Sequence, residues 1–235
     1  MKLSNETVTV LKNFSTINQN LVIKSGNSIS TMSAMKNIVA SAEVKETFPT
    51  EFAIYDLNEF LASLSLFDNP DLQFKDDFVV ISKYGAAPEL RPFGPHLKYW
   101  YSDPSVVTTV TKEITMPECE VSFSLKNNML SDIQKAAAVI GVPDMVLEAM
   151  SVGKAILKVT DKKNSTANDY AVGVDVTNED GKDLPYKFWF KVENLKLLSG
   201  TYNVGVSSKN ISYFKNTNVD IEYWIALEPE SKYDA

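Results

Sequence analysis

The residues that could carry out chemistry in this chain are few, and they are scattered along it. The one histidine, His96, lies in a proline-rich stretch, and the one cysteine, Cys119, has no histidine near it in the sequence. A nucleophile–base pair or a histidine-based metal site needs such groups together. The pattern therefore favours a solvated loop histidine and a partly buried, apolar cysteine over catalytic roles.

Two pairs of adjacent acids could in principle hold a metal ion or transfer protons. Asp76 and Asp77 form one pair, and Glu179 and Asp180 form the other. Both pairs lie in sequences typical of turns, where solvated acids are common. The 9 glycines are scattered and never take the spacing of a phosphate-binding loop. We therefore predict no enzymatic activity, no cofactor and no metal site.

Lysines on predicted helices offer a different chemistry, which is attraction of phosphate groups. At about 100° per residue, Lys12 lies opposite Phe14, and Lys135 lies opposite Ile133. A lysine opposite an apolar stripe is usually only solvated, but it can contact phosphates where several such helices line one surface. The candidate phosphate-facing lysines are Lys12, Lys126, Lys135 and Lys196.

These lysines depend on a strand–helix junction that recurs four times along the chain. In each case an alternating apolar segment runs into a predicted helix, and an asparagine lies near the helix start: Asn5, Asn58, Asn128 and Asn194. The predicted N-caps of the first three helices are Ser4, Asp56 and Asn127, and Gly141 is the predicted C-terminal residue of the third. One unit used four times indicates a duplicated architecture.

The apolar stripes set the predicted length and face of each helix. They comprise Val10, Phe14, Ile17 and Leu21 in the first helix, with Leu21 beyond its end; Leu57, Leu61 and Leu64, with Phe60 alongside, in the second; and Met129, Ile133, Ala136 and Ile140 in the third. The fourth helix, Asn194 to Leu198, is about one turn long. The second helix breaks the basic pattern, because Glu59 and Ser63 occupy its predicted polar face.

Strands dominate the rest of the chain. Alternation with a period of two predicts antiparallel strands at 170–176, 186–192 and 219–227. The predicted fold is α+β, with two similar domains that each contain two β-α-β-β-β units, antiparallel sheets and two helices. The predicted domains are 1–108 and 117–235, joined by an extended connector over 102–116, and an irregular loop covers Ala86–Pro95.

The composition narrows the class of protein. The 235 residues are 44% hydrophobic, which suffices for one large core or two ordinary domains. The sequence shows no membrane span and no signal peptide, and a single cysteine suits a reducing cytoplasm. The net charge of −7 argues against a protein that coats nucleic acid with its whole surface, although it leaves room for a local basic face.

At the level of extended similarity, the chain resembles a known family. The segments that carry the resemblance include 1–4, 11–18, 53–66, 103–107 and 223–231. They resemble the DNA polymerase sliding clamp (processivity factor) of T-even-type bacteriophages. The resemblance implies a head-to-tail homotrimeric ring of six similar domains, with sheets outside and helices around duplex DNA. The four lysines above would then face the DNA, and the lining would be unevenly basic.

Two protein-binding sites follow from the resemblance. Strand 97–101 of one subunit would pair with strand 170–176 of the next, through Tyr99, Trp100, Tyr101, Tyr170, Val172 and Val174. An ordinary pairing within a domain is the alternative. An apolar C-terminal peptide of each partner would bind at Val106, Val107, Val110, Leu227 and Pro229. These five residues could instead be domain-packing contacts.

The resemblance also implies a function. The ring would tether the replicative DNA polymerase in the host cytoplasm, would be loaded by an ATP-driven clamp loader, and could assist RNA polymerase-associated factors in late transcription. A β-rich viral structural or assembly protein remains the alternative, and a small-molecule-binding barrel is disfavoured by the repeated junction.

Overall fold

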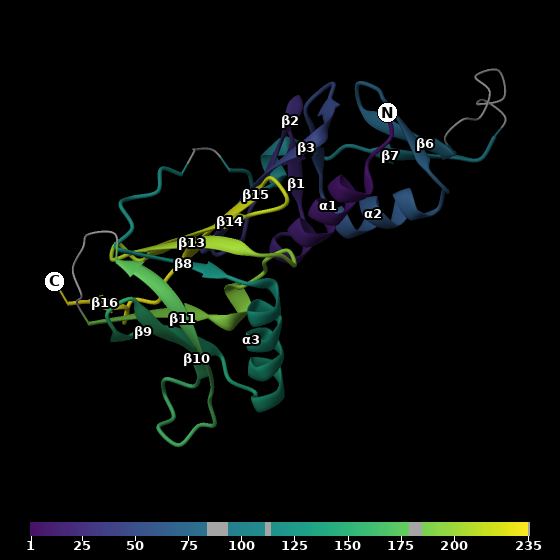
Figure 1. Cartoon of the computed structure of the whole chain (residues 1–235). Helices are drawn as coiled ribbons and strands as arrows, with labels where there is room; N and C mark the ends of the chain where they lie inside the picture. Colours follow the sequence, from purple (N-terminus) through teal and green to yellow (C-terminus); the bar gives the residue numbers. More distant parts are fainter. Residues whose placement is uncertain (84–93, 111–113, 179–184, 235) are drawn as a thin grey trace. The chain divides into compact units, whose positions relative to one another are not determined.

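A computed structural model of the chain describes residues 1–83, 94–110, 114–178 and 185–234 (Figure 1). The chain divides into two compact units, Met1–Thr111 and Lys112–Ala235. The predicted connector spans this division, and the domain limits 1–108 and 117–235 stay predictions. Glu179 and Asp180 lie outside the described residues, as does most of the predicted loop 86–95.

The first unit contains two helices and seven strands in its described part. In chain order they are α1 (Asn5–Ile17), β1 (Leu21–Ile23), β2 (Gly26–Met32), β3 (Ile38–Phe48), β4 (Phe52–Ile54), α2 (Leu57–Ser65), β5 (Pro70–Phe74), β6 (Phe78–Lys83) and β7 (His96–Trp100). The connector begins with a 3-10 turn, η2 (Pro104–Val106), so it is not extended throughout. The predicted unit β-α-β-β-β is complete once, as β4-α2-β5-β6-β7.

The first predicted strand, before α1, is absent from the described residues. Residues 1–4 have no strand assignment, yet Met1 exchanges main-chain hydrogen bonds with Leu72 of β5. The physical reason is that Ser4 already serves the helix: its side chain caps α1 and its N–H donates to the Glu46 carboxylate, so that N–H is not available for strand pairing. Ser4 caps α1 by accepting a hydrogen bond from the Thr7 N–H, as the sequence predicts.

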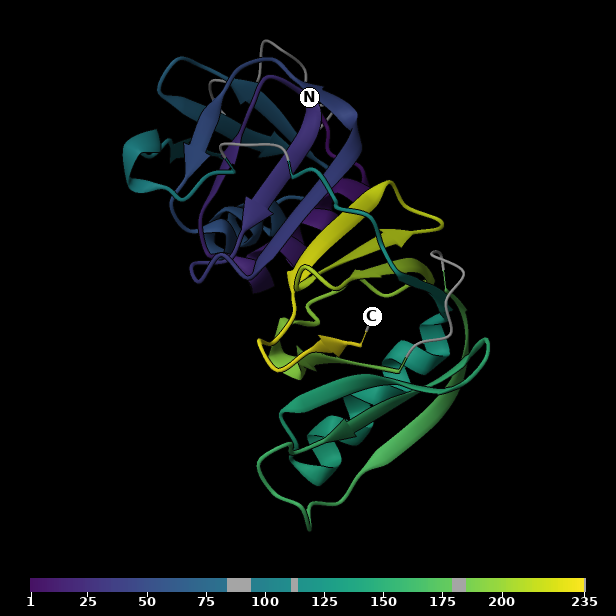
Figure 2. The ribbon, with the colours of Figure 1, turned by 90° about the vertical axis from the view of Figure 1, so that its left-hand side faces the viewer.

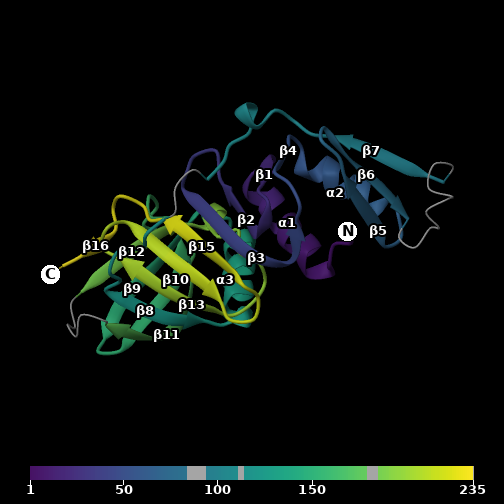
Figure 3. The same cartoon turned by 90° about the horizontal axis from the view of Figure 1, so that it is seen from above.

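The strands of the first unit form two antiparallel groups. One has the order β3-β2-β1-β4, and the other has the order β5-β6-β7. Figure 3 shows β5, β6 and β7 side by side, with α2 beside them. Helices α1 and α2 pack against each other (Figure 1), and the buried side chains of Phe14, Phe48 and Phe60 fill the core of this unit.

The second unit begins with a strand and repeats the predicted order. Its elements are β8 (Val121–Leu125), α3 (Asn127–Ile140), β9 (Asp144–Ser151), β10 (Lys154–Thr160), β11 (Tyr170–Asn178), β12 (Tyr186–Lys191), η3 (Val192–Asn194), β13 (Tyr202–Ser207), β14 (Ile211–Asn216), β15 (Ile221–Ala226) and β16 (Lys232–Tyr233). Both β8-α3-β9-β10-β11 and β12-η3-β13-β14-β15 follow the predicted order, with a 3-10 turn in place of the second helix.

All strand pairs of the second unit are antiparallel, in the order β16-β12-β9-β10-β11-β8-β13-β14-β15. Alternate residues of β12 and β15 are buried, as their period-two patterns predict. Helix α3 packs on β10 and β11 (Figure 2), and the fully buried rings include Phe188, Phe190 and Phe214.

The fourth predicted helix, Asn194 to Leu198, is wrong. Only Val192–Asn194 form a 3-10 turn, and Leu195 leaves the helical region with φ −78° and ψ 52°. Leu195 and Leu197 are both buried, so the segment buries alternate residues like a strand. Burial of these two leucines decides the local conformation over helix propensity.

Candidate functional site

Lys12 lies where the sequence predicts it, on the solvent face of α1. Val10, Leu11, Phe14 and Ile17 are buried on the opposite face. Lys12 shares its exposed face with Asn5, Thr9 and Thr16. The acid of this helix, Glu6, pairs with Lys45 of β3 at 2.8 Å. The exposed face of α1 therefore carries one positive charge among small polar groups, and a neutral or anionic ligand could approach it.

Glu46 on β3 fixes the start of α1. Its carboxylate accepts hydrogen bonds from the Ser4 N–H and the Thr7 hydroxyl. Burial disfavours the charged form, but the hydrogen bonds from Thr7 and Ser4 outweigh this cost and hold the pKa of Glu46 below its ordinary value. A negative charge at a helix N-terminus is also favourable. This contact orients the helix that presents Lys12.

Helix α2 carries no basic residue, as predicted, but its buried face differs from the predicted one at Ser63. Asp56 caps it by accepting hydrogen bonds from the N–H groups of Asn58 and Glu59. Ser63 is buried rather than solvent-facing, because the apolar stripe follows Leu57, Phe60 and Leu64. An i, i+3, i+7 stripe rotates the buried face toward Ser63.

Helix α3 presents Lys126 and Lys135 to solvent. Its buried stripe consists of Leu130, Ile133 and Ala137, so the predicted stripe was displaced by one residue at Met129 and Ala136. The buried residues follow the spacing i, i+3, i+7 rather than i, i+4, i+7, because α3 packs on β10 and β11 through this face. The predicted C-terminal residue, Gly141, adopts the left-handed conformation with φ 70°.

The N-terminus of α3 is unusual. Lys126 holds the N-cap position without a side-chain cap, and the predicted cap, Asn127, is the first helical residue. A cation at the positive end of a helix dipole disfavours the helix. Within the unit, the charge of Lys126 is partly offset by Asp175 of β11, whose pKa is lowered mainly by its hydrogen bond with Lys154 and further by the charge of Lys126. Lys126 is also exposed, so an anion could approach it.

Lys196 lies in the extended segment after η3, next to α3. The Gln134 side chain on α3 donates a hydrogen bond of 2.9 Å to the Leu195 carbonyl. The Leu198 N–H donates to the Tyr223 hydroxyl at 3.0 Å. The segment thus replaces the predicted helix while keeping Lys196 next to the helix that bears Lys135. The second unit brings these lysines onto neighbouring segments.

Strand β7 is an edge of its sheet in the part of the chain that the structure describes. The side chains of β7 differ strongly in solvent exposure. Trp100 is 62% exposed, whereas Tyr99 is buried and packs on Phe60 with ring centroids 5.1 Å apart. Burial raises the pKa of Tyr99 to about 12. Of the predicted interface residues on β7, Trp100 is therefore available on the surface and Tyr99 belongs to the core; Tyr101, just beyond the strand, is half-buried.

Strand β11 also has a free edge over part of its length. Tyr170–Asp175 pair with β10, whereas only Val176–Asn178 pair with β8. The second edge of Tyr170–Asp175 has no strand partner among the described residues. The predicted interface residue Val174 is buried, Val172 is half-buried and Tyr170 is 37% exposed. A groove of about 300 Å³, lined by parts of β8, β11 and β13, opens where β11 leaves β8.

The predicted partner site divides between the two units. In the first unit Val106 is 59% exposed, whereas Val107 packs with Val22 and Ala53. Val110 is half-buried. In the second unit the Leu227 side chain is buried and Pro229 is exposed. The buried members have packing roles, and the site as a whole stays a prediction.

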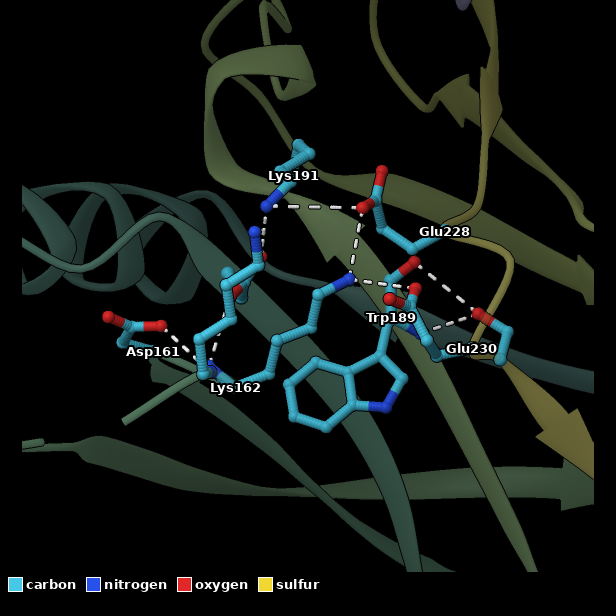
Figure 4. A network of polar contacts seen from close by, with 9 residues as sticks. Asp161, Lys162, Trp189, Lys191, Glu228 and Glu230 are labelled. Atoms are coloured by element: carbon cyan, nitrogen blue, oxygen red, sulfur yellow. Dashed lines mark hydrogen bonds and ion pairs between the residues drawn. The ribbon is translucent and has the colours of Figure 1, made fainter. Parts of the chain in front are cut away.

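A charged cluster in the second unit was missed by sequence reasoning (Figure 4). The Lys162 ammonium lies 3.0 Å from the Glu228 carboxylate and 2.8 Å from that of Glu230. The Lys191 ammonium lies 2.6 Å from the buried Asp144 carboxylate. The partners are far apart in sequence, so no local signal could reveal the cluster. It holds the segment after β15 to the rest of this unit.

The other reactive side chains, His96 and Cys119, belong to different units of the chain. His96 is exposed, but it is the first residue of β7 rather than a loop residue, because it pairs with Ser82. Cys119 is half-buried, and its thiol donates to the Pro117 carbonyl at 3.8 Å. Within the described ranges, no group of three His, Cys, Asp or Glu residues could hold a metal ion. No helix in those ranges is long and apolar enough to cross a membrane.

Comparison with known proteins gives consistent matches over both units. The family described as "DNA polymerase processivity factor" matches residues 3–81, and that described as "gp45 sliding clamp, C terminal" matches residues 122–229. A sliding clamp of Vibrio phage KVP40 is 34% identical over 97% of this chain and 99% of its own length. The sliding clamp of Enterobacteria phage T4 is 26% identical over all of both chains.

A solved structure supports the same fold. Proliferating cellular nuclear antigen from Entamoeba histolytica superposes with a TM-score of 0.65 over 95% of each chain, at 14% sequence identity. At that identity the likeness bears on the fold alone. The predicted α+β architecture is confirmed by this match.

Proposed function

The chain belongs to the sliding clamp family of phage DNA polymerase processivity factors, and from this premise we propose that three copies close into a ring around duplex DNA and tether the polymerase. The observation that carries the proposal is the pair of free strand edges, β7 in the first unit and Tyr170–Asp175 of β11 in the second. The sliding clamp family is non-catalytic, and we propose no enzymatic activity for this chain.

The two edges suit each other as halves of a heterologous interface. An exposed edge presents unpaired N–H and C=O groups, and pairing with another strand satisfies them. Strand β7 offers His96–Trp100, and β11 offers Tyr170–Asp175, so their lengths are similar. Because the two edges lie on different parts of the same chain, head-to-tail pairing repeats until the rotation closes a ring.

The charges of the exposed faces also favour this pairing. Lys98 lies on β7 and Asp169 lies next to β11, whereas Asp175 of β11 is already paired with Lys154 of β10. Opposite charges across an interface raise the association rate and fix register. Trp100, as a large exposed ring beside such an edge, is the type of residue that dominates binding energy.

Light scattering tests the ring. We expect the wild-type chain, with a subunit mass of 26.2 kDa, to form trimers at micromolar concentration. Val172→Pro or Trp100→Glu should yield monomers, whereas Val152→Glu, at an exposed valine in the turn after β9, should leave the trimer intact. A monomeric wild type, or a Val172→Pro protein that remains trimeric, would contradict the proposed interface.

The four predicted lysines give the ring its attraction for DNA. Lys12, Lys126 and Lys135 are exposed, and Lys196 is half-buried beside α3. Phosphate contacts need only positive charge, so these few lysines suit sequence-independent sliding, while a net charge of −7 limits coating of DNA from outside. Retention on closed circular DNA, with loss on linear DNA, is the expected result once the ring is loaded.

Partner proteins would bind at the predicted apolar site. The partners we propose are the DNA polymerase, an ATP-driven clamp loader and RNA polymerase-associated late transcription factors, all in the host cytoplasm. Since Val107 and Leu227 are buried, substitutions there would also disturb packing. The exposed Val106 and Pro229 are better probes, and Val106→Glu with Pro229→Glu should weaken polymerase stimulation while the trimer persists.

A further inference from the structure

The segment that follows β15 is a structured turn. The Ser231 N–H donates a 3.0 Å hydrogen bond to the Glu228 carbonyl, which closes a four-residue β-turn. Pro229 is the second residue of the turn, where its fixed φ favours this geometry. The Glu228 N–H donates to the Trp189 carbonyl at 2.8 Å, and the Trp189 N–H donates to the Ser231 hydroxyl at 2.8 Å. Strand β12 thus holds both ends of the turn.

Lys162 approaches this turn from a different part of the chain, two residues after β10 ends. Its side chain is only 10% exposed, and its ammonium group contacts the carboxylates of both Glu228 and Glu230 (Figure 4). Burial disfavours the charged form of Lys162, but hydrogen bonds with Glu230 and Glu228 outweigh this and raise its pKa. One cation therefore bridges two corners of the turn.

Lys191 of β12 also contacts the Glu228–Ser231 turn. Its ammonium group bonds to Asp144 at 2.6 Å and lies 3.9 Å from Glu228. The other oxygen of Asp144 accepts a 3.0 Å hydrogen bond from the Lys162 N–H, so it positions the main chain that carries Lys162. A carboxylate that is 1% exposed needs such partners, since a buried unpaired charge is costly.

We infer that Lys162 is a positioning residue for partner binding: by clasping both carboxylates of the Glu228–Ser231 turn, it presents Pro229, next to Leu227, to an apolar partner peptide. This inference rests on the proposed partner site. Pro229 is exposed between Glu228 and Glu230, and the carboxylates of both acids contact the Lys162 ammonium group. The exposed Pro229 is thus held in an ordered turn, and the shared cation reduces the repulsion between the acids on either side of it.

The expected effect is on affinity, through preorganisation. A partner binds only the fraction of molecules whose turn is correctly formed, so the apparent Kd rises as that fraction falls. Removal of the Lys162 charge leaves Glu228 and Glu230 close together without a shared cation. If this lowers the ordered fraction to about one tenth, the apparent Kd rises about tenfold.

The test compares four variants with the wild type. Lys162→Gln removes the cation, and Lys162→Arg keeps it. Glu230→Gln removes one of the two carboxylates; because the Glu230 side chain is 58% exposed, this change should not disturb folding. Lys163→Gln is the matched control, because Lys163 is the exposed neighbouring lysine. The probe is a synthetic peptide of the C-terminal residues of the DNA polymerase encoded with this clamp, and its Kd is measured by calorimetry.

Hydrogen exchange at the Ser231 amide and the mass of the ring are measured alongside. We expect Lys162→Gln to weaken peptide binding about tenfold and to speed hydrogen exchange at Ser231, and Glu230→Gln to have smaller effects of the same kind. For Lys162→Arg and Lys163→Gln, the Kd should stay within about twofold of the wild-type value. The ring mass should be unchanged in all four variants. A wild-type chain that binds no peptide overturns the partner site and the inference together. Wild-type binding that Lys162→Gln leaves unchanged overturns the inference alone.

Discussion

The contact of Glu46 with the N-terminus of α1 provides a quantitative prediction. Glu46→Gln keeps the size of the side chain but removes the charge that accepts from Ser4 and Thr7. A hydrogen bond to a charged group contributes roughly 1.5–3 kcal/mol, and the loss of a helix cap costs roughly 0.5–2 kcal/mol. Because Glu46 is only partly buried and the amide keeps one acceptor, we expect a loss of about 1–1.5 kcal/mol in the free energy of unfolding.

The pH dependence follows from the direction of the pKa shift. The pKa of Glu46 is lower in the folded chain than in the unfolded chain, so its contribution is present above the unfolded pKa and is lost as pH falls through the folded pKa. The stability difference between wild type and Glu46→Gln should therefore be constant near neutral pH and should shrink in acid. At the lowest pH both side chains are uncharged.

Urea unfolding followed by circular dichroism measures this difference across the pH range. Glu43→Gln is the matched control, because Glu43 is exposed on the same strand. The control should differ from wild type by less than about 0.5 kcal/mol. A Glu46→Gln protein as stable as wild type at neutral pH, or a difference that is the same at every pH, would refute the reasoning.

Three further predictions concern the second unit. Lys126→Gln combined with Lys135→Gln should reduce the salt dependence of DNA binding by up to about two units of log–log slope, as measured by fluorescence anisotropy, with ring mass unchanged. Gly205→Ala should destabilise the unit by about 1–3 kcal/mol, because the new Cβ would lie 2.7 Å from the Cys119 sulfur; in a Cys119→Ala background thermal unfolding should show a smaller loss. Gly141→Ala should lower stability by about 1 kcal/mol in urea unfolding, because φ there is 70°.

Local features of this fold could be predicted from the sequence. Ser4 and Asp56 cap their helices, and Gly141 ends α3, because each residue acts on main-chain groups within a few positions. The alternation of β12 and β15 is likewise contained in a short window. Each of these features depends on residues close together in the sequence, so it can be predicted without knowledge of the fold.

Features that depend on packing could not be predicted in this way. Leu195 and Leu197 are compatible with a helix, but both are buried on an extended segment whose carbonyl at Leu195 is held by Gln134 on α3. The stripe of α3 shifted to Leu130 and Ala137 for a related reason, since the strands beneath select the buried face. In both cases distant residues decide between two locally acceptable conformations.

The distribution of charge on the helices links these findings to function. If stability alone had selected the residues, the start of α3 would carry an acid or a polar cap; it carries Lys126, while the start of α1 is supported from β3 by Glu46. Asp175 of β11 attracts Lys126 in the free protein, and phosphate groups near α3 would provide a second attraction. Replacing Lys126 with Gln should therefore change the stability of the free protein by less than about 0.5 kcal/mol and weaken its contact with DNA. Weaker DNA binding at nearly unchanged stability distinguishes a DNA-facing lysine from one that is only solvated.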